Sequence, residues 1–148
     1  MAPTADEACI FCKIVRRQAP ASLVDEDEHT VAFLDIRPIN SGHVLVIPKA
    51  HATNLSELAP ELGAHMFQRS MAVAAALRQS GLRCDGVNLH LADGEAAGQD
   101  IFHVHLHVFP RYRGDGFGLR VGPHYGRIVG RQELDDVAQK IRRSMTPH

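Results

Sequence analysis

The stretch His103-Val104-His105-Leu106-His107-Val108-Phe109 decides the fold of this chain. On a β-strand, successive side chains point to opposite faces of the sheet. We therefore predict a strand, ended by Pro110, whose three histidines share one face while the apolar residues between them share the other. Histidine changes its charge near neutral pH, binds metals and can act as a nucleophile. The stretch thus predicts a sheet with one face in the core and a reactive or metal-binding site on the other.

The rest of the sequence predicts the α+β class. Its 148 residues are enough for one compact domain. Short apolar runs between turn residues predict strands at 22–24, 30–34, 43–47 and 86–91. Helical spacing of apolar residues predicts a short helix at 11–17, a long central helix at 60–80 and a C-terminal helix at 132–145. Consecutive hairpin strands around one long helix are typical of a mostly antiparallel sheet.

The composition argues against several classes of protein. A net charge of −1 offers no basic face for nucleic acid. No apolar run has the length of a membrane span, and the N-terminus lacks the pattern of a signal peptide. Three cysteines in such a chain do not suggest a disulfide framework. We therefore expect a cytoplasmic protein that uses neither nucleic acid nor a membrane as its partner.

The two ends of the chain are expected to differ from its centre. We expect residues 1–8 to be disordered and residues 9–148 to form the single domain. Within that domain, residues 113–148 form a variable tail. The tail begins with a glycine-rich stretch, residues 113–126, which we interpret as a mobile loop.

Three interpretations of the alternating histidines remain open. They can be the polar face of an ordinary half-buried strand, although strict alternation disfavours this. They can bind one metal ion, since His-x-His on a strand presents two ligands together. Alternatively, one imidazole can be a nucleophile whose neighbours fix its tautomer and hold an anionic substrate.

Two cysteines near the N-terminus have the spacing of metal ligands. Cys9 and Cys12 can bind one zinc ion, and they can equally be two buried thiols. A redox pair is disfavoured because the sequence context of a thioredoxin-type motif is missing. A site with two cysteines and two histidines would need His51, just after a strand, and one of the strand histidines.

Two further features could bind a ligand. The glycine-rich segment Gly94–Asp100 directly precedes the histidines, and its small residues leave backbone N–H groups free to face a phosphate. Because no Lys-Ser/Thr pair follows, this segment is not a P-loop. Asp35 ends an apolar strand, where it either caps a turn or accepts hydrogen bonds from vicinal hydroxyls.

The motif Gly98–His107 (GQDIFHVHLH) resembles the defining motif of the histidine-triad (HIT) superfamily. Four other segments occur in the order seen in bacterial HIT proteins: Cys9–Ile14, Ala32–Pro38, Gly42–His51 and Pro110–Tyr112. The resemblance covers about residues 9–113. It implies a HIT-like fold with a five-stranded antiparallel sheet, a long central helix and a C-terminal helix, usually as a homodimer that pairs through the long helix.

The resemblance also implies a function. It implies binding of an AMP-like purine nucleotide and hydrolysis or transfer at the α-phosphate through a nucleotidyl-histidine intermediate. Nucleoside phosphoramidates and dinucleoside polyphosphates are both possible substrates. The alternatives are a nucleotide-binding regulatory protein with little turnover and a hydrolase with all three histidines on a catalytic metal.

The resemblance assigns residues to these roles. The catalytic residues are His105, the nucleophile, together with His107 and Gln99. The nucleotide-binding residues are Ile10, Phe11, Ile14, Asp35, Ile36, Gly98, Gln99, Asp100, His105 and His107. The ligands of a structural zinc ion are Cys9, Cys12, His51 and His103.

The sequence departs from the family pattern at two positions. Ala92 stands where relatives often have Asn or Gln, so that one polar phosphate contact is missing. Asp100 stands where some relatives have a Ser or Thr that donates to phosphate. A carboxylate there would repel phosphate unless it turns away or is protonated.

Overall fold

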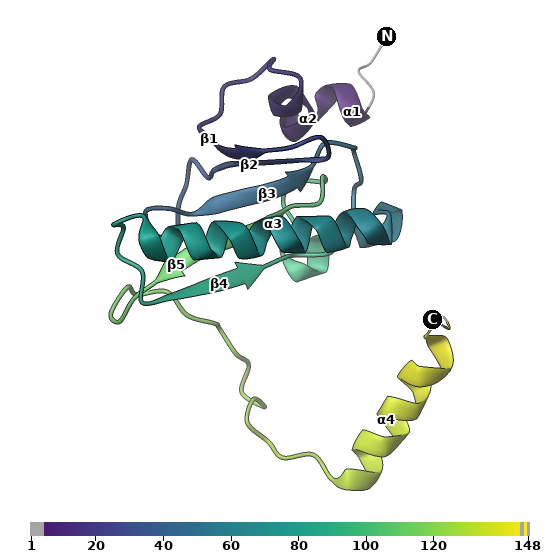
Figure 1. Ribbon diagram of the computed structural model, residues 1–148. Helices are drawn as coiled ribbons and strands as arrows, with labels where there is room; N and C mark the ends of the chain where they lie inside the picture. Colours follow the sequence, from purple (N-terminus) through teal and green to yellow (C-terminus); the bar gives the residue numbers. More distant parts are fainter. Residues whose placement is uncertain (1–4, 146, 148) are drawn as a thin grey trace. The chain divides into compact units, whose positions relative to one another are not determined.

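The structure, a computed structural model, describes residues 5–145 and 147 (Figure 1). Its described residues up to Phe117 form one compact unit, and those from Gly118 onward form a second. The single domain over residues 9–148 stays a prediction. The predicted disorder of residues 1–4 lies outside the described residues. Among the described residues, no helix combines the length and the apolar character needed to cross a membrane.

The first unit is built on a five-stranded antiparallel sheet, which confirms the predicted α+β fold. The strands are β1 (Leu23–Glu26), β2 (Thr30–Leu34), β3 (Val44–Pro48), β4 (Gly86–His90) and β5 (Leu106–Arg111). Their order in the sheet is β1-β2-β3-β5-β4, and every neighbouring pair is antiparallel. The long helix α3 (Pro60–Gln79) packs against β3, β5 and β4 (Figure 1).

Alternate residues of the central strands enter two separate apolar clusters. Ala32, Val44 and Val46 pack with α3, together with the apolar residues that alternate with the three histidines, Val104, Leu106 and Val108. The neighbours of opposite parity, Val31, Phe33, Leu45 and Ile47, pack with the short helix α2 (Ile10–Val15). Because side chains alternate along a strand, α2 and α3 cover opposite faces of the sheet. The histidines therefore lie on the α2 face, as the alternation predicted.

The strand β5 differs from the predicted histidine strand at both ends. It begins at Leu106, because the N–H of Val104 donates to the carbonyl of Ala52 (2.8 Å) instead of joining the sheet. It also continues through Pro110, whose carbonyl accepts from the side chain of Asn40 (2.9 Å). The backbone carbonyl of Pro110 thus points to the side of β5 on which β3 has already ended. On that side Pro110 has no strand partner, so its missing N–H costs the sheet no hydrogen bond.

The N-terminal segment is more ordered than we expected. Helix α1 (Ala5–Ala8) occupies part of the predicted disordered region, and it contacts α2. An ion pair between Asp6 and Arg16 (2.5 Å) links the two helices. Helix α2 ends two residues before the predicted end at residue 17.

Two single-turn 3₁₀ helices, η1 (Leu55–Glu57) and η2 (Glu95–Ala97), lie in the loops of the first unit. Residues 113–117 also belong to this unit, where we expected the start of a mobile loop. The buried carboxylate of Asp115 accepts from Arg111 (2.6 and 2.9 Å) and from Asn40 (2.9 Å), which fixes this segment to the end of β5.

The second unit contains helix α4 (Arg131–Ser144), within one residue of its predicted bounds. No residue of α4 is buried. Its apolar residues Leu134, Val137 and Ile141 recur at helical spacing and are 40–58% exposed. Their spacing, which predicted the helix, therefore makes α4 amphipathic.

Candidate functional site

A cavity of about 620 Å³ opens between α2, the end of β2 and the histidine segment. Eight of the predicted nucleotide-binding residues line it: Ile10, Phe11, Ile14, Asp35, Ile36, Asp100, His105 and His107. Gly98 and Gln99 are not among its lining residues. The walls are mostly apolar, with acidic groups and imidazoles at particular points, which is the usual composition of a small-molecule site.

His105 is held in one tautomer by the backbone. Its Nδ1 lies 2.7 Å from the carbonyl oxygen of His103, which can only accept a hydrogen bond. The neutral ring therefore carries its hydrogen on Nδ1 and keeps an unshared electron pair on Nε2. The ring is 4% exposed and packs edge-on against Phe11, with centroids 5.2 Å apart. This arrangement presents Nε2 as a fixed nucleophile or ligand atom in the cavity wall.

A second pair of histidines forms a short hydrogen-bonded chain. The backbone N–H of Ile39 donates to Nδ1 of His43 (3.0 Å), so the neutral His43 carries its hydrogen on Nε2. This Nε2 lies 2.8 Å from Nδ1 of His107, which therefore accepts. The hydrogen of His107 then sits on its own Nε2, where it can be donated to a bound anion. The ring of His107 lies 4.9 Å from that of His105.

His43 was not predicted as a site residue. It directly precedes β3, and it lies two and four residues before Leu45 and Ile47, which face α2. Side chains at this spacing share one face of a strand. A histidine at this parity in an otherwise apolar run was the available signal. Burial lowers the pKa of His43, although the Asp35 carboxylate 3.7 Å away opposes the shift.

The pKa of His107 leads to a testable pH dependence. Burial, with a smaller effect of the neighbouring histidines, lowers this pKa from 6.5 to about 4. Between these values the unfolded chain binds a proton that the folded chain does not, so stability is lost as the pH falls from 6.5 towards 4. We expect His107 to account for about 1–2 kcal/mol of the loss in unfolding free energy between pH 7 and pH 5.

Urea unfolding of the wild type and of His107→Gln at both pH values measures this contribution. The variant should lose less stability than the wild type on acidification, whereas His124→Gln, which removes an exposed histidine, should behave as the wild type. Equal losses in the wild type and in His107→Gln would contradict the expectation.

Gln99 has a different place from the one we predicted. Its Nε2 donates to the carbonyls of Thr53 (2.6 Å) and Ile101 (3.1 Å), and its Oε1 accepts from the N–H of Gly94 (2.8 Å). The buried amide is thus occupied by backbone groups. Gln99 is therefore a positioning residue that fixes the segment before the histidines, and the prediction of a catalytic group is not supported by this geometry.

Asp100, the next residue, does not turn away from the histidines. Its side chain is 75% exposed, and its Oδ1 lies 4.0 Å from Nε2 of His105. Gly98 precedes the pair with a φ of +90°, as the C-cap of η2. Only glycine adopts this conformation readily, so Gly98 shapes the loop without lining the cavity.

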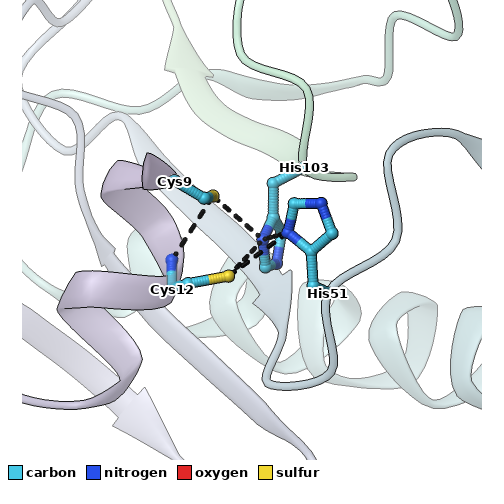
Figure 2. A group of neighbouring side chains, drawn as sticks. All are labelled: Cys9, Cys12, His51 and His103. Atoms are coloured by element: carbon cyan, nitrogen blue, oxygen red, sulfur yellow. Dashed lines mark hydrogen bonds between the residues drawn. The ribbon is translucent and has the colours of Figure 1, made fainter. Parts of the chain in front are cut away.

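The four predicted zinc ligands lie together (Figure 2). Cys12 Sγ lies 3.2 Å from His51 Nδ1 and 3.5 Å from His103 Nδ1, and Cys9 Sγ lies 3.4 Å from His103 Nδ1. The two Nδ1 atoms are 3.2 Å apart. A tetrahedral zinc site with bonds of about 2.0–2.3 Å separates its ligand atoms by about 3.3–3.8 Å. The spacing of these side chains therefore fits one zinc ion.

The protonation chemistry of this cluster also fits a metal. Nε2 of His103 donates to the carbonyl of Pro48 (2.9 Å), which leaves the electron pair of Nδ1 for a ligand. Burial lowers the pKa of His103 to about 4, so the ring is neutral at pH 7. Burial raises the pKa of the Cys12 thiol, which opposes a reactive thiolate in the absence of a cation. Cys9 and Cys12 are both free thiols.

The structure divides the three histidines between different partners. Among the described residues, the side-chain groups close enough to share a metal ion are the cysteine–histidine cluster and the trio Asp35, His43 and His107. His105 belongs to neither group. This arrangement contradicts the alternative in which all three alternating histidines bind one catalytic metal.

Comparisons with known proteins agree with this fold and site. A family model, the HIT domain, matches residues 16–114. Protein hit from Bacillus subtilis is 47% identical over 113 residues, 76% of this chain and 77% of that protein. Adenylylsulfatase HINT3 from Arabidopsis thaliana is 38% identical over 112 residues, 76% of this chain and 56% of that protein.

A crystal structure of a zinc-bound histidine triad family protein from Mycobacterium smegmatis is also similar. It is 40% identical, with a TM-score of 0.74, and the match covers 95% of this chain and 99% of that chain. Together with the family model, which spans well over half of the sequence, these matches settle the family. The chain belongs to the HIT domain family.

Proposed function

We propose that this protein is a hydrolase or transferase of purine nucleotides that cleaves at the α-phosphate through a nucleotidyl-His105 intermediate. The observation that carries the proposal is the hydrogen bond from Nδ1 of His105 to the backbone, which in the neutral ring leaves the electron pair of Nε2 facing the cavity. The similarity to Adenylylsulfatase HINT3 supports it.

The cavity has places for the parts of a nucleotide. The apolar side chains of Ile10, Phe11 and Ile14 offer a surface for the base. One oxygen of Asp35 accepts from the N–H of Arg37 (2.8 Å), which fixes the carboxylate while its remaining electron pairs can accept from ribose hydroxyls. The α-phosphate then falls near His105 and His107.

The reaction takes place in two displacements. Nε2 of His105 attacks phosphorus, and the bond to the leaving group breaks with its electron pair going to that group. A leaving group that departs as an amine takes up a proton from solvent as the bond breaks. His107 donates the hydrogen on its Nε2 to a phosphoryl oxygen and stabilises the charge that develops there. Water then attacks phosphorus, the P–N bond returns its electron pair to Nε2, and the proton of the water is released to solvent.

A substrate panel with rapid quenching tests this proposal. Adenosine phosphoramidate, diadenosine polyphosphates and adenylyl sulfate are mixed with the enzyme and quenched within the first turnover. We expect mass spectrometry to find one adenylyl group on the peptide that contains His105. AMP binding without turnover or adduct would instead indicate the regulatory protein, and turnover with no adduct on any substrate would contradict the intermediate.

The cysteine–histidine cluster completes the proposal. We infer that Cys9, Cys12, His51 and His103 hold a structural zinc ion. Four protein ligands leave no open position for substrate, so the ion stabilises the fold and supplies no reactive group. The zinc-bound relative supports this assignment.

The assembly and location remain predictions that belong to the same proposal. Phe67 and Met71 lie one turn apart on α3 and are 53% and 58% exposed, and β4 is an edge strand of the sheet. Apolar side chains at this exposure support a homodimer that pairs through α3. Equilibrium sedimentation of the full chain, expected at twice 16.2 kDa, measures it. We expect the dimer to work in the cytoplasm, without nucleic acid or a membrane as partner.

A further inference from the structure

The carboxylate of Asp100 lies beside the imidazole that attacks in the proposed reaction. Its Oδ1 lies 4.0 Å from Nε2 of His105, the atom that attacks in the proposed reaction. The backbone on its N-terminal side is fixed, because the amide of Gln99 makes three hydrogen bonds to backbone groups. The position of Asp100 beside the nucleophile is therefore built into the loop.

Little positive charge offsets this carboxylate. Among the described residues that line the cavity, Arg37 is the only Lys or Arg, whereas two residues, Asp35 and Asp100, are acidic. Arg37 follows Asp35 in the turn after β2, at the ribose end of the cavity. The phosphate end thus offers imidazoles and a carboxylate, whereas a polyphosphate site usually presents Lys, Arg or a cation.

We propose that Asp100 selects substrates by the charge of the leaving group, favouring a neutral or cationic amine over an anionic phosphate or sulfate. This inference rests on the proposed function, since it concerns the group displaced by His105. A phosphoramidate brings one charged phosphoryl group to the site and releases an amine. A dinucleoside polyphosphate or an adenylyl sulfate brings additional negative charge next to the reacting phosphorus.

The expected effect follows from Coulomb's law. In an in-line displacement, the leaving atom lies about 5 Å from the attacking nitrogen, so its charge lies within several ångströms of Asp100. Because the carboxylate is mostly exposed, water screens the interaction. Two unit charges about 6 Å apart under such screening change a rate by roughly 3- to 30-fold.

A charge-neutral replacement tests the inference. For the wild type and Asp100→Asn, kcat/KM is measured on adenosine phosphoramidates of a neutral and a cationic amine, on diadenosine tetraphosphate and on adenylyl sulfate. We expect Asp100→Asn to raise kcat/KM for the two anionic leaving groups by about 3- to 30-fold relative to the neutral amine. The cationic amine should lose its advantage over the neutral one.

Glu95→Gln is the matched control. Glu95 begins η2 in the same loop, is exposed and is not a lining residue of the cavity. The same change in net charge at this position should leave the ratios within twofold of the wild type. Ratios in Asp100→Asn that also stay within twofold would overturn the inference, because the carboxylate would then not act on the leaving group.

A binding measurement separates this inference from the proposed function. Calorimetry compares AMP with adenosine, which lacks the phosphate. We expect Asp100→Asn to bind AMP at least threefold more tightly and adenosine with unchanged affinity. If the wild type turns over none of the substrates, the proposed function is wrong. If Asp100→Asn also binds AMP with unchanged affinity, the proposed effect of the Asp100 charge on the phosphate is overturned as well.

Discussion

Replacing His105 with alanine is expected to lower kcat by at least about 10³-fold while changing the affinity for AMP by less than about tenfold. The substitution removes the nitrogen that forms the covalent intermediate, so neither displacement can proceed through it. The apolar walls and Asp35 remain in place to bind the nucleotide. Steady-state kinetics and calorimetry on the same preparation measure the two effects separately.

His29→Ala is a suitable control for the loss of an imidazole. His29 is exposed in the turn between β1 and β2 and is not a lining residue of the cavity. Its replacement should leave both kcat and AMP affinity within twofold of the wild type. Turnover in His105→Ala comparable to that of the wild type would show that another group forms the bond to phosphorus, and the assignment of the nucleophile would fall.

The sheet could be predicted because its information is local. Strict alternation in the histidine segment determines which side chains share a face, and the structure buries Val104, Leu106 and Val108 with α3 as expected. The bounds of β5 could not be predicted in the same way. They depend on contacts with Ala52 and Asn40, which are distant in the sequence and leave no periodic signal.

The site was predicted to the extent that its residues fall in one motif. His105 has its tautomer fixed by the carbonyl two residues earlier, which is again a local feature. The partner of His107 is not local, because His43 reaches it across the β3–β5 pair, in which Leu45 lies opposite His107. Gln99 shows the same limit, since its amide donates to a carbonyl 46 residues away, a contact that the motif does not reveal.

Loss of the zinc site is expected to lower the melting temperature by at least about 10 °C, since structural zinc sites contribute on the order of 10 kcal/mol in small domains. The cluster joins α2 to the segment after β3 and to the histidine segment, so its ligands tie together three parts of the chain. We expect elemental analysis to find one zinc ion per chain. Chelation of the wild type and the substitution Cys12→Ser should give similar losses, measured by thermal unfolding.

Cys84→Ser is the matched control, because Cys84 is a free cysteine outside the cluster. It should keep its zinc and melt within a few degrees of the wild type, and chelation should destabilise it as it destabilises the wild type. Since the carbonyl of His103 orients His105, loss of the metal should also lower kcat, by less than the loss of the nucleophile. The opposite result would be wild-type protein that is purified without zinc and melts at the same temperature as Cys12→Ser, both before and after zinc is added. These four side chains would then be neighbours in the fold that bind no metal.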